Sequence, residues 1–186
     1  MEKKKTRRVF KQSDMKSGDG MLTTVWGPPL WHVLHTMSFN YPVSPTPEQK
    51  HQYRDFVLQL EYVLPCKYCR MNLKKNFKAV PLTMKEMESR DTFSRYVYRL
   101  HEHINKMLGK KSGLTYCDVR ERYEHFRARC TTAPTPPTEK GCTEPLVHGK
   151  KAKCVMNIVP VETQCETMHI SKECLKSRLN TRKQLP

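Results

Sequence analysis

The chain has 186 residues, of which 37% are hydrophobic, and its 34 Lys and Arg against 18 Asp and Glu give a formal net charge of +16. This length favours one domain with tails, and the charge indicates a nucleic acid or an anionic surface as one class of partner. No apolar run reaches the roughly 18–20 residues of a membrane span, and no apolar segment follows the basic N-terminus, so neither a membrane span nor a secretory signal peptide is expected.

Residues 1–20 are basic and polar, and we expect a disordered arm that either stays solvated or contacts nucleic acid or a membrane surface. A first helix is expected over about residues 24–40, where apolar residues recur at helical spacing. Pro28 and Pro29 suit its first turn, where a missing N–H costs nothing, and Pro42 ends it.

A second helix is expected from Thr46 to Leu64. Thr46 can cap its N-terminus, Pro47 suits the first helical position, and an apolar stripe follows at i, i+3, i+4 spacing. Pro65 interrupts this helix because it disfavours helical geometry at the residue before it. A short third helix is expected from Pro65 to about Phe77.

A fourth helix is expected over about residues 89–108, with one apolar face and Gly109 as its C-terminal cap. Thr115 and Asp118 have the spacing of a capping box, which predicts a fifth helix. No segment of residues 21–130 alternates as a strand does. The prediction for residues 21–130 is an all-α domain, a four-helix bundle plus a short fifth helix.

Residues 131–186 differ in character from the domain before them. They begin with a Pro/Thr linker, expected to be extended, and continue as a polar tail without a sustained period. The cysteines at the border and in the tail are Cys130, Cys142, Cys154, Cys165 and Cys174, each at least nine residues from the next. We therefore expect flexible extensions at both ends of the helical domain.

Cys66 and Cys69 form the one CxxC motif among eight cysteines, a number that fits redox or metal chemistry in a chain without a secretory signal. On the first turn of a helix that starts at Pro65, both thiols lie on one face, where a disulfide is allowed. The helix N-terminus, Lys67 and Arg70 should lower the pKa of the thiols and favour thiol–disulfide exchange. The alternative is half of a zinc site, which needs about four N or S ligands, and no second CxxC supplies them.

Two helix faces carry ring and amide side chains at i, i+4: Trp31 and His35 on the first helix, His101 and Asn105 on the fourth. Facing one cleft, these four can sandwich a flat heteroaromatic group such as adenine or isoalloxazine, although each pair alone is more commonly an ordinary core Trp or His. Lys110 and its neighbouring lysines either bind a pyrophosphate or complement the helix C-terminus. No GxGxxG follows a strand, so a Rossmann flavin site is not expected.

Taken in order, these motifs resemble the Erv/Alr family of FAD-linked sulfhydryl oxidases. The matching motifs are Trp26-Gly-x-x-x-Trp31-x-x-Leu-His35, Tyr41-Pro42, Cys66-x-x-Cys69 and His101-x-x-x-Asn105-x-x-Leu108-Gly109-Lys110. The resemblance covers roughly residues 24–126. The lysine-rich arm and the Leu-Pro-Cys-x-x-Cys-Arg context look most like the copies that large DNA viruses encode.

The resemblance implies a helical, homodimeric enzyme that binds FAD non-covalently, oxidises dithiols of client proteins to disulfides and passes electrons to O2, giving H2O2. It implies that Cys66 exchanges with the client and that Cys69 lies nearer the flavin. No metal site is expected, because no second CxxC supplies the remaining zinc ligands. The residues that match FAD-contacting positions of the family are Gly27, Trp31, His35, Tyr41, His101, Asn105, Leu108, Lys110 and Tyr123.

Three departures from the family pattern affect the expected FAD contacts and one disulfide. Glu102 stands where the family has Asn after His101. Tyr98 stands at the first position of a structural disulfide that many members carry, and Cys117 is one residue from the second, so that bridge is expected to be absent. Leu114 replaces the usual aromatic residue after the Gly-Lys run.

Two functions of different classes follow from the sequence: a FAD-dependent thiol oxidase, or a Cys-rich basic module that binds zinc and nucleic acid. A viral oxidase is expected in the host cytoplasm or the virion, and otherwise the mitochondrial intermembrane space is expected. The tail cysteines either relay oxidation between the client and Cys66 or take no part in the chemistry.

Overall fold

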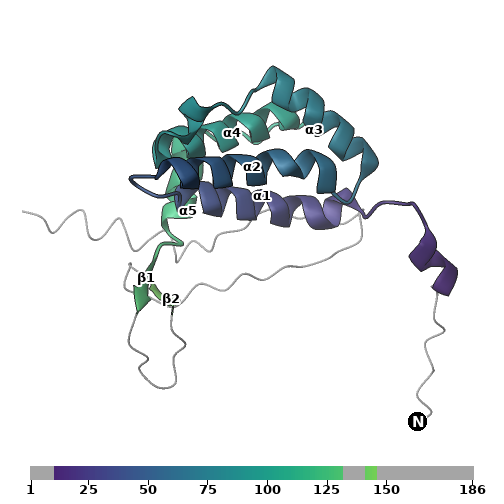
Figure 1. The fold of residues 1–186 in the computed structure, drawn as a ribbon, viewed down its shortest axis with the longest axis horizontal. Coiled ribbons are helices and arrows are strands. Elements are labelled where there is room, and N and C mark those ends of the chain that lie inside the picture. Colours follow the sequence, from purple (N-terminus) through teal and green to yellow (C-terminus); the bar gives the residue numbers. More distant parts are fainter. Residues whose placement is uncertain (1–10, 132–140, 146–186) are drawn as a thin grey trace, which may run out of the picture.

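The described part of the chain is mainly a bundle of helices (Figure 1). The computed structural model describes residues 11–131 and 141–145. Its α-helices are α1 (Thr23–Phe39), α2 (Pro47–Val63), α3 (Lys67–Ala79), α4 (Arg90–Met107) and α5 (Tyr116–Glu124). Helix α1 packs on α4, α2 packs on α3, and α5 contacts both α1 and α4. The predicted four-helix bundle with a short fifth helix is therefore confirmed.

The helices begin and end where the sequence supplies caps. The Thr46 hydroxyl accepts a hydrogen bond from a backbone N–H of the first turn at 3.2 Å, and Pro47 is the first residue of α2. The Thr115 hydroxyl accepts from the Asp118 N–H at 3.3 Å, while the Asp118 carboxylate accepts from the Thr115 N–H at 2.8 Å. Gly109, at φ +67°, follows the end of α4.

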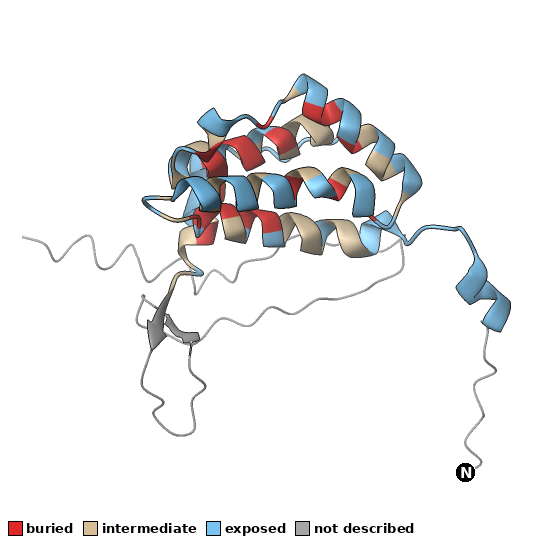
Figure 2. Cartoon of the chain, in the orientation of Figure 1, coloured by how far each residue is buried: buried red, intermediate tan, exposed pale blue. Residues whose placement is uncertain are grey.

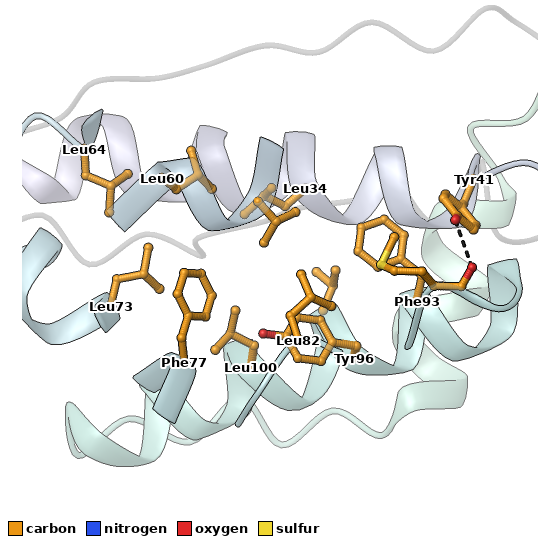
Figure 3. Close-up of a cluster of buried hydrophobic side chains, with 13 residues drawn as sticks. Leu34, Tyr41, Leu60, Leu64, Leu73, Phe77, Leu82, Phe93, Tyr96 and Leu100 are labelled. Carbon is orange, nitrogen blue, oxygen red and sulfur yellow. Dashed lines mark hydrogen bonds between the residues drawn. The ribbon is translucent and has the colours of Figure 1, made fainter. Parts of the chain in front are cut away.

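The main core lies between the inner faces of α1, α2, α3 and α4, and the exposed residues face outward (Figures 2 and 3). Its buried members are Leu34, Tyr41, Val57, Leu60, Leu64, Leu73, Phe77, Leu82, Met87, Phe93, Tyr96, Val97 and Leu100. Each side chain of this size stabilises the fold by about 1.5–3 kcal/mol when fully buried. This core fixes the relative positions of the four long helices.

A second, aromatic core attaches α5 to α1 and α4. Phe39, Tyr116, Val119 and Tyr123 are buried together, and the Ser94 and Tyr116 hydroxyls are hydrogen-bonded at 2.8 Å. The rings of Phe39 and Tyr123 stack with centroids 5.4 Å apart. Helix α5 is thereby held against the same end of α1 that carries the histidines described below.

The expectation that residues 21–130 contain no strand is wrong for the last three residues of this range. Strand β1 (Ala128–Thr131) pairs antiparallel with β2 (Gly141–Pro145), and the register makes Cys130 and Cys142 partners. Strands of four and five residues separated by a long connection leave too little alternation for a period-two pattern to be recognised.

Two short 3₁₀ helices complete the described chain: η1 (Gln12–Lys16), which lies within the arm predicted to be disordered, and η2 (Met84–Met87), which leads into α4. Residues 1–10 lie outside the described residues, as do the tail cysteines Cys154, Cys165 and Cys174. Within the part of the chain that is described, no helix is both long and apolar enough to cross a membrane.

Candidate functional site

The CxxC motif lies at the N-terminus of α3, with its two cysteines in different local conformations. Cys66 is extended (φ −151°) and is the N-cap, so α3 begins at Lys67 and not at Pro65 as the sequence predicted. The Cys66 sulfur accepts a hydrogen bond from the Cys69 N–H at 3.3 Å, which is the role that an oxygen plays in most N-caps. Both cysteines are half-buried free thiols.

The two thiols differ in acidity, contrary to the prediction that both pKa values fall. Hydrogen bonds to the side chain and backbone of Cys69 lower the pKa of the Cys66 thiol. Burial raises the pKa of the Cys69 thiol, and the hydrogen bond with Cys66 raises it further. Cys66, the thiol at the helix N-terminus, is therefore the more acidic of the two.

A segment just before α1 lies against the start of the CxxC motif. We call residues 19–22 the strap. The Met21 N–H donates to the Pro65 carbonyl at 2.8 Å, and the Trp26 indole N–H donates to the Met21 carbonyl at 3.0 Å. A Cβ on Gly20 would lie 2.8 Å from the Pro65 oxygen and 3.3 Å from the Cys66 Cα, so this close approach requires glycine.

The first residue of α1 reaches the CxxC pair through its side chain. The Thr23 hydroxyl lies 3.7 Å from the Cys69 sulfur, and either atom can donate. This contact helps the Cys69 thiolate because a hydroxyl can donate to negative sulfur. The sequence analysis did not single out Thr23, because 46 positions separate it from Cys69 and no local pattern links them.

The predicted ring residues of α1 and α4 meet directly. The Trp31 and His101 rings stack with centroids 4.0 Å apart and planes 6° apart, and His35 Nε2 lies 3.0 Å from His101 Nδ1. His35 also stacks on Tyr123, at 5.2 Å. Trp31 and His101 are in contact, so they do not form the predicted sandwich here. A planar group can stack on an outer face of the pair or enter after they separate.

Burial keeps the two histidines of this array uncharged. It lowers the pKa of His35 to about 3, with the His101 and His32 rings adding to the effect, and lowers the pKa of His101 to about 4. The Nδ1 atom of His35 is buried and has no hydrogen-bond partner among the described residues. An unpaired buried polar atom is costly in a native protein, so His35 Nδ1 is an available contact for a bound group.

An open pocket lies beside these rings. It is lined by His35, Tyr98, His101, Glu102, Ser112, Leu114, Val119, Arg122 and Tyr123. It therefore brings together His35, His101 and Tyr123 from the predicted cofactor set. The sequence analysis missed Ser112, Val119 and Arg122, since no motif distinguishes them from other loop and helix-surface residues.

Six residues of the predicted cofactor set do not line this pocket. Trp31 stacks on His101 as described above, and two others, Tyr41 and Gly27, lie elsewhere in the bundle. Tyr41 is fully buried in the main core, where its hydroxyl donates to the Met87 carbonyl at 2.9 Å and its ring packs edge-on against Tyr53 and Phe93. Gly27 lies inside α1, and a Cβ there would make one ordinary contact with Thr23. Packing therefore accounts for Tyr41 but gives no reason for glycine at position 27.

The remaining three cofactor candidates lie at the end of α4. The Asn105 side-chain amide donates to the Glu102 carboxylate at 3.0 Å, and the Asn105 backbone carbonyl accepts from the Lys110 N–H at 2.8 Å. Leu108 is the exposed C-cap of the helix. The turn through Gly109 thus holds Lys110 next to the helix end. Among the described residues, no group of three or more His, Cys, Asp or Glu could hold a metal ion.

The buried histidines make stability depend on pH in a defined window. The folded pKa values of about 3 for His35 and about 4 for His101 lie below the ordinary 6.5, so the unfolded chain binds more protons between these limits. Stability is therefore complete above pH 6.5 and falls below it, by up to about 1.4 kcal/mol per pH unit for each histidine. Urea unfolding at several pH values between 6.5 and 4 measures this slope. His101→Gln should halve it, whereas His51→Gln, at an exposed position of α2, should not change it.

The Thr23 contact predicts the reactivity of Cys69. Replacing Thr23 with valine removes the hydroxyl at constant shape, and we expect Cys69 alkylation by iodoacetamide to slow about threefold, as the loss of one hydrogen bond implies. Thr23→Ser should retain the wild-type rate, and Thr24→Val, at the exposed neighbouring position, is the matched control. Site-resolved mass spectrometry should also show Cys66 reacting before Cys69; the opposite order would contradict the assigned acidities.

Comparison with known proteins agrees with the geometry. The profile of the Erv1 / Alr family matches residues 28–127. A mimivirus protein named "Probable FAD-linked sulfhydryl oxidase R368" is 35% identical over 99 residues, which are 53% of this chain and 68% of that protein. The yeast mitochondrial FAD-linked sulfhydryl oxidase ERV1 is 29% identical over 80 residues, covering 43% of this chain and 41% of the yeast protein.

The fold has a counterpart among solved structures. The crystal structure of the yeast Erv1 core superposes with a TM-score of 0.50 at 23% identity, covering 63% of this chain and 92% of the yeast chain. At this identity the superposition supports the helical fold alone. The profile match spans more than half of the chain, and the motifs that it covers include the CxxC pair and the ring residues. The chain therefore belongs to the Erv1 / Alr family.

Proposed function

We propose that this protein is a FAD-dependent thiol oxidase that forms disulfide bonds in protein dithiols through Cys66 and Cys69. The observation that carries the proposal is the Cys66 sulfur at the N-cap of α3, which accepts the Cys69 N–H and has a lowered pKa. Membership of a family whose viral and yeast relatives are named FAD-linked sulfhydryl oxidases supports it. None of the relatives described above is named as a zinc- or nucleic-acid-binding protein, so we do not favour that alternative.

The residues beside the pocket fit FAD. His35 Nδ1 is a buried atom without a partner, the rings of Trp31, His101 and Tyr123 offer stacking surfaces, and Arg122 in the pocket lining adds positive charge. With these residues we propose Gly27, Asn105, Leu108 and Lys110 as further contacts. FAD, when bound, would supply a two-electron acceptor for the dithiol and pass the electrons to O2, giving H2O2.

The chain's own part of the reaction is thiol–disulfide exchange. In the disulfide state of the pair, a client thiolate attacks the Cys66 sulfur, and the electron pair of the broken bond leaves on Cys69. The second client thiolate then attacks the client sulfur of the mixed disulfide, forming the client disulfide and releasing Cys66. The client has lost two electrons, which the reduced pair now holds.

The acidities of the two thiols suit these steps. Cys66 leaves readily in the second exchange because its pKa is lowered. Cys69 is the poorer leaving group, since burial raises its pKa, and the Thr23 hydroxyl can donate to the developing thiolate. Cys69, unlike Cys66, packs against the main core, which suits a thiol that faces the cofactor and not the client.

The family resemblance extends the proposal to a homodimer. Val33 on α1 and Phe56 on α2 are large apolar residues that are 47% and 44% exposed, and burial of such side chains against a second copy would favour association. The relatives include viral and mitochondrial proteins. For the location we propose the host cytoplasm or the virion over the mitochondrion, because the mimivirus relative covers 53% of this chain and the yeast relative 43%.

Two single substitutions test the proposed chemistry. We expect the purified protein to be yellow, absorbing at about 450 nm as flavins do, and to consume O2 with a small dithiol. Cys66→Ser and Cys69→Ser should each lower turnover by at least about 1,000-fold, because each removes one of the two sulfurs that must exchange. Cys117→Ser, at the exposed cysteine of α5, is the matched control and should keep wild-type turnover.

The spectrum separates this proposal from a folding defect and from the zinc alternative. Both serine variants should retain flavin absorbance, which shows that the domain is folded. Full turnover in either variant would rule out the CxxC mechanism, and a colourless protein that contains zinc would favour the alternative function.

The tail cysteines provide a further test of how clients reach Cys66. If one tail pair relays oxidation, deletion of residues 131–186 should reduce protein-dithiol oxidation while small-dithiol oxidation continues. The backbone register of β1 and β2 makes Cys130 and Cys142 the first pair to replace by serine. Equal rates on a protein client with and without the tail would show that no relay operates.

A further inference from the structure

Helix α3 carries positive charge beside the CxxC pair and no negative charge. Residues 64–85 include six Lys and Arg and no Asp or Glu. The exposed residues of α3 on the side away from the core are Lys67, Tyr68, Met71, Lys74, Lys75, Lys78 and Ala79. These lysines recur at intervals of three, four and seven residues, so they form a stripe along the outer face of the helix.

This stripe is not neutralised within the described part of the chain. The ion pairs found there involve Arg54, Arg95, Arg99, His125 and Arg127, and none involves a lysine of α3. Arg70, the one arginine among these six cations, donates from its guanidinium to the Leu64 carbonyl. The lysine charges are therefore available to a partner, and their summed field can steer an oppositely charged one.

Exposed apolar side chains lie near Cys66, on the first turns of α3 and on the strap. Tyr68 and Met71 on α3 are 74% and 50% exposed, and Met21 and Leu22 of the strap are 70% and 74% exposed. The strap and the start of α3 lie together at one end of the bundle (Figure 1), because the Met21 N–H bonds the Pro65 carbonyl. Exposed apolar side chains that cluster beside a reactive thiol indicate a surface that binds another molecule.

We infer that this surface, α3 with the strap, selects clients whose dithiol lies in a segment that is acidic and carries apolar side chains next to its cysteines. The inference rests on the proposed oxidase function. Apolar residues of the client would contact Tyr68 and Met71 while its cysteine reaches Cys66, and its carboxylates would lie along the lysine stripe.

Other occupants fit this surface less well. Residues 131–186 of this chain hold nine Lys and Arg against five Asp and Glu, so the stripe repels the tail. A nucleic acid matches the charge but brings neither a thiol for Cys66 nor aliphatic groups for the apolar side chains. Asp19, the carboxylate of the strap, accepts a hydrogen bond from Ser17 and leaves the net charge of the surface positive.

The test uses the full-length, flavin-loaded protein and three synthetic dithiol peptides. The peptides share one CxxC and its apolar neighbours and differ in carrying flanking Glu, Gln or Lys residues. We expect kcat/KM for the Glu peptide to exceed that for the Lys peptide by about tenfold, mainly through KM. The difference should vanish in about 1 M salt, where the Debye length is about 3 Å, and turnover of a small uncharged dithiol should be unaffected.

A charge reversal locates the effect on α3. Lys74→Glu should lower kcat/KM for the Glu peptide about threefold and leave the small dithiol unchanged. Lys50→Glu makes the same change of charge near the start of α2, about 20 Å from the CxxC end at 1.5 Å per residue, and should have no effect. Equal kcat/KM for the Glu and Lys peptides would overturn the inference while small-dithiol turnover upholds the oxidase.

A binding measurement tests the surface without turnover. The Glu peptide with serines in place of its cysteines, labelled for fluorescence anisotropy, should bind wild type at least about threefold more tightly than Lys74→Glu. If small-dithiol turnover is absent but this binding difference is present, the oxidase proposal fails and the surface assignment stands. Displacement of the peptide by single-stranded DNA, with the same dependence on Lys74, would assign the surface to nucleic acid and overturn the inference.

Discussion

The position of Pro65 determines the geometry of the CxxC pair. Proline disfavours helical geometry at the residue before it, and the main chain at Leu64 is indeed non-helical, at φ −55° and ψ 137°. The chain must therefore leave α2 and start a new helix within two residues, which makes Cys66 the N-cap of α3. The same break frees the Pro65 carbonyl from any helix, and the strap bonds to it through Met21.

The consequence of this arrangement is an asymmetric pair of thiols. In a single continuous helix, Cys66 and Cys69 would lie one turn apart in similar surroundings. Here Cys66 is the N-cap and Cys69 the third helical residue, so their surroundings differ. The Cys66 sulfur accepts a hydrogen bond from the Cys69 N–H, while the Cys69 sulfur lies against the Thr23 hydroxyl. Backbone geometry, set by one proline, thus gives the Cys66 thiol the lower pKa and gives the higher pKa to the Cys69 thiol, which packs against the main core.

Much of the fold could be predicted from the sequence because its signals are local. The capping residues Thr46 and Thr115 and the helix end at Gly109 follow from side chains within a few positions. The site was predictable only in part. Trp31, His35 and His101 share helix faces and do meet, but the stacking of Trp31 directly on His101 depends on how α1 packs against α4.

Three unpredicted features depend on contacts between distant segments. Tyr41 lies in the core, where its hydroxyl donates to the carbonyl of Met87, 46 positions along the chain. Thr23 contacts Cys69 across the same sequence separation. The acidity of Cys69 was mispredicted because charge and helix position can be read locally whereas burial cannot. Burial was decisive here, although Lys67 and Arg70 lie within one turn.

The strap connects the two halves of the site. It is anchored to α1 through the Trp26 indole and to the CxxC segment through Pro65, and Gly20 allows no larger residue at that contact. Helix α1 also carries Trp31 and His35, so one rigid helix fixes the rings at one point and the strap at another. Because α1 and α4 share the main core, a displacement of α1 would alter the ring stack and the Thr23–Cys69 contact together. The thiol pair and the ring pocket therefore share α1 as a common support, which keeps both on rigid elements of the bundle.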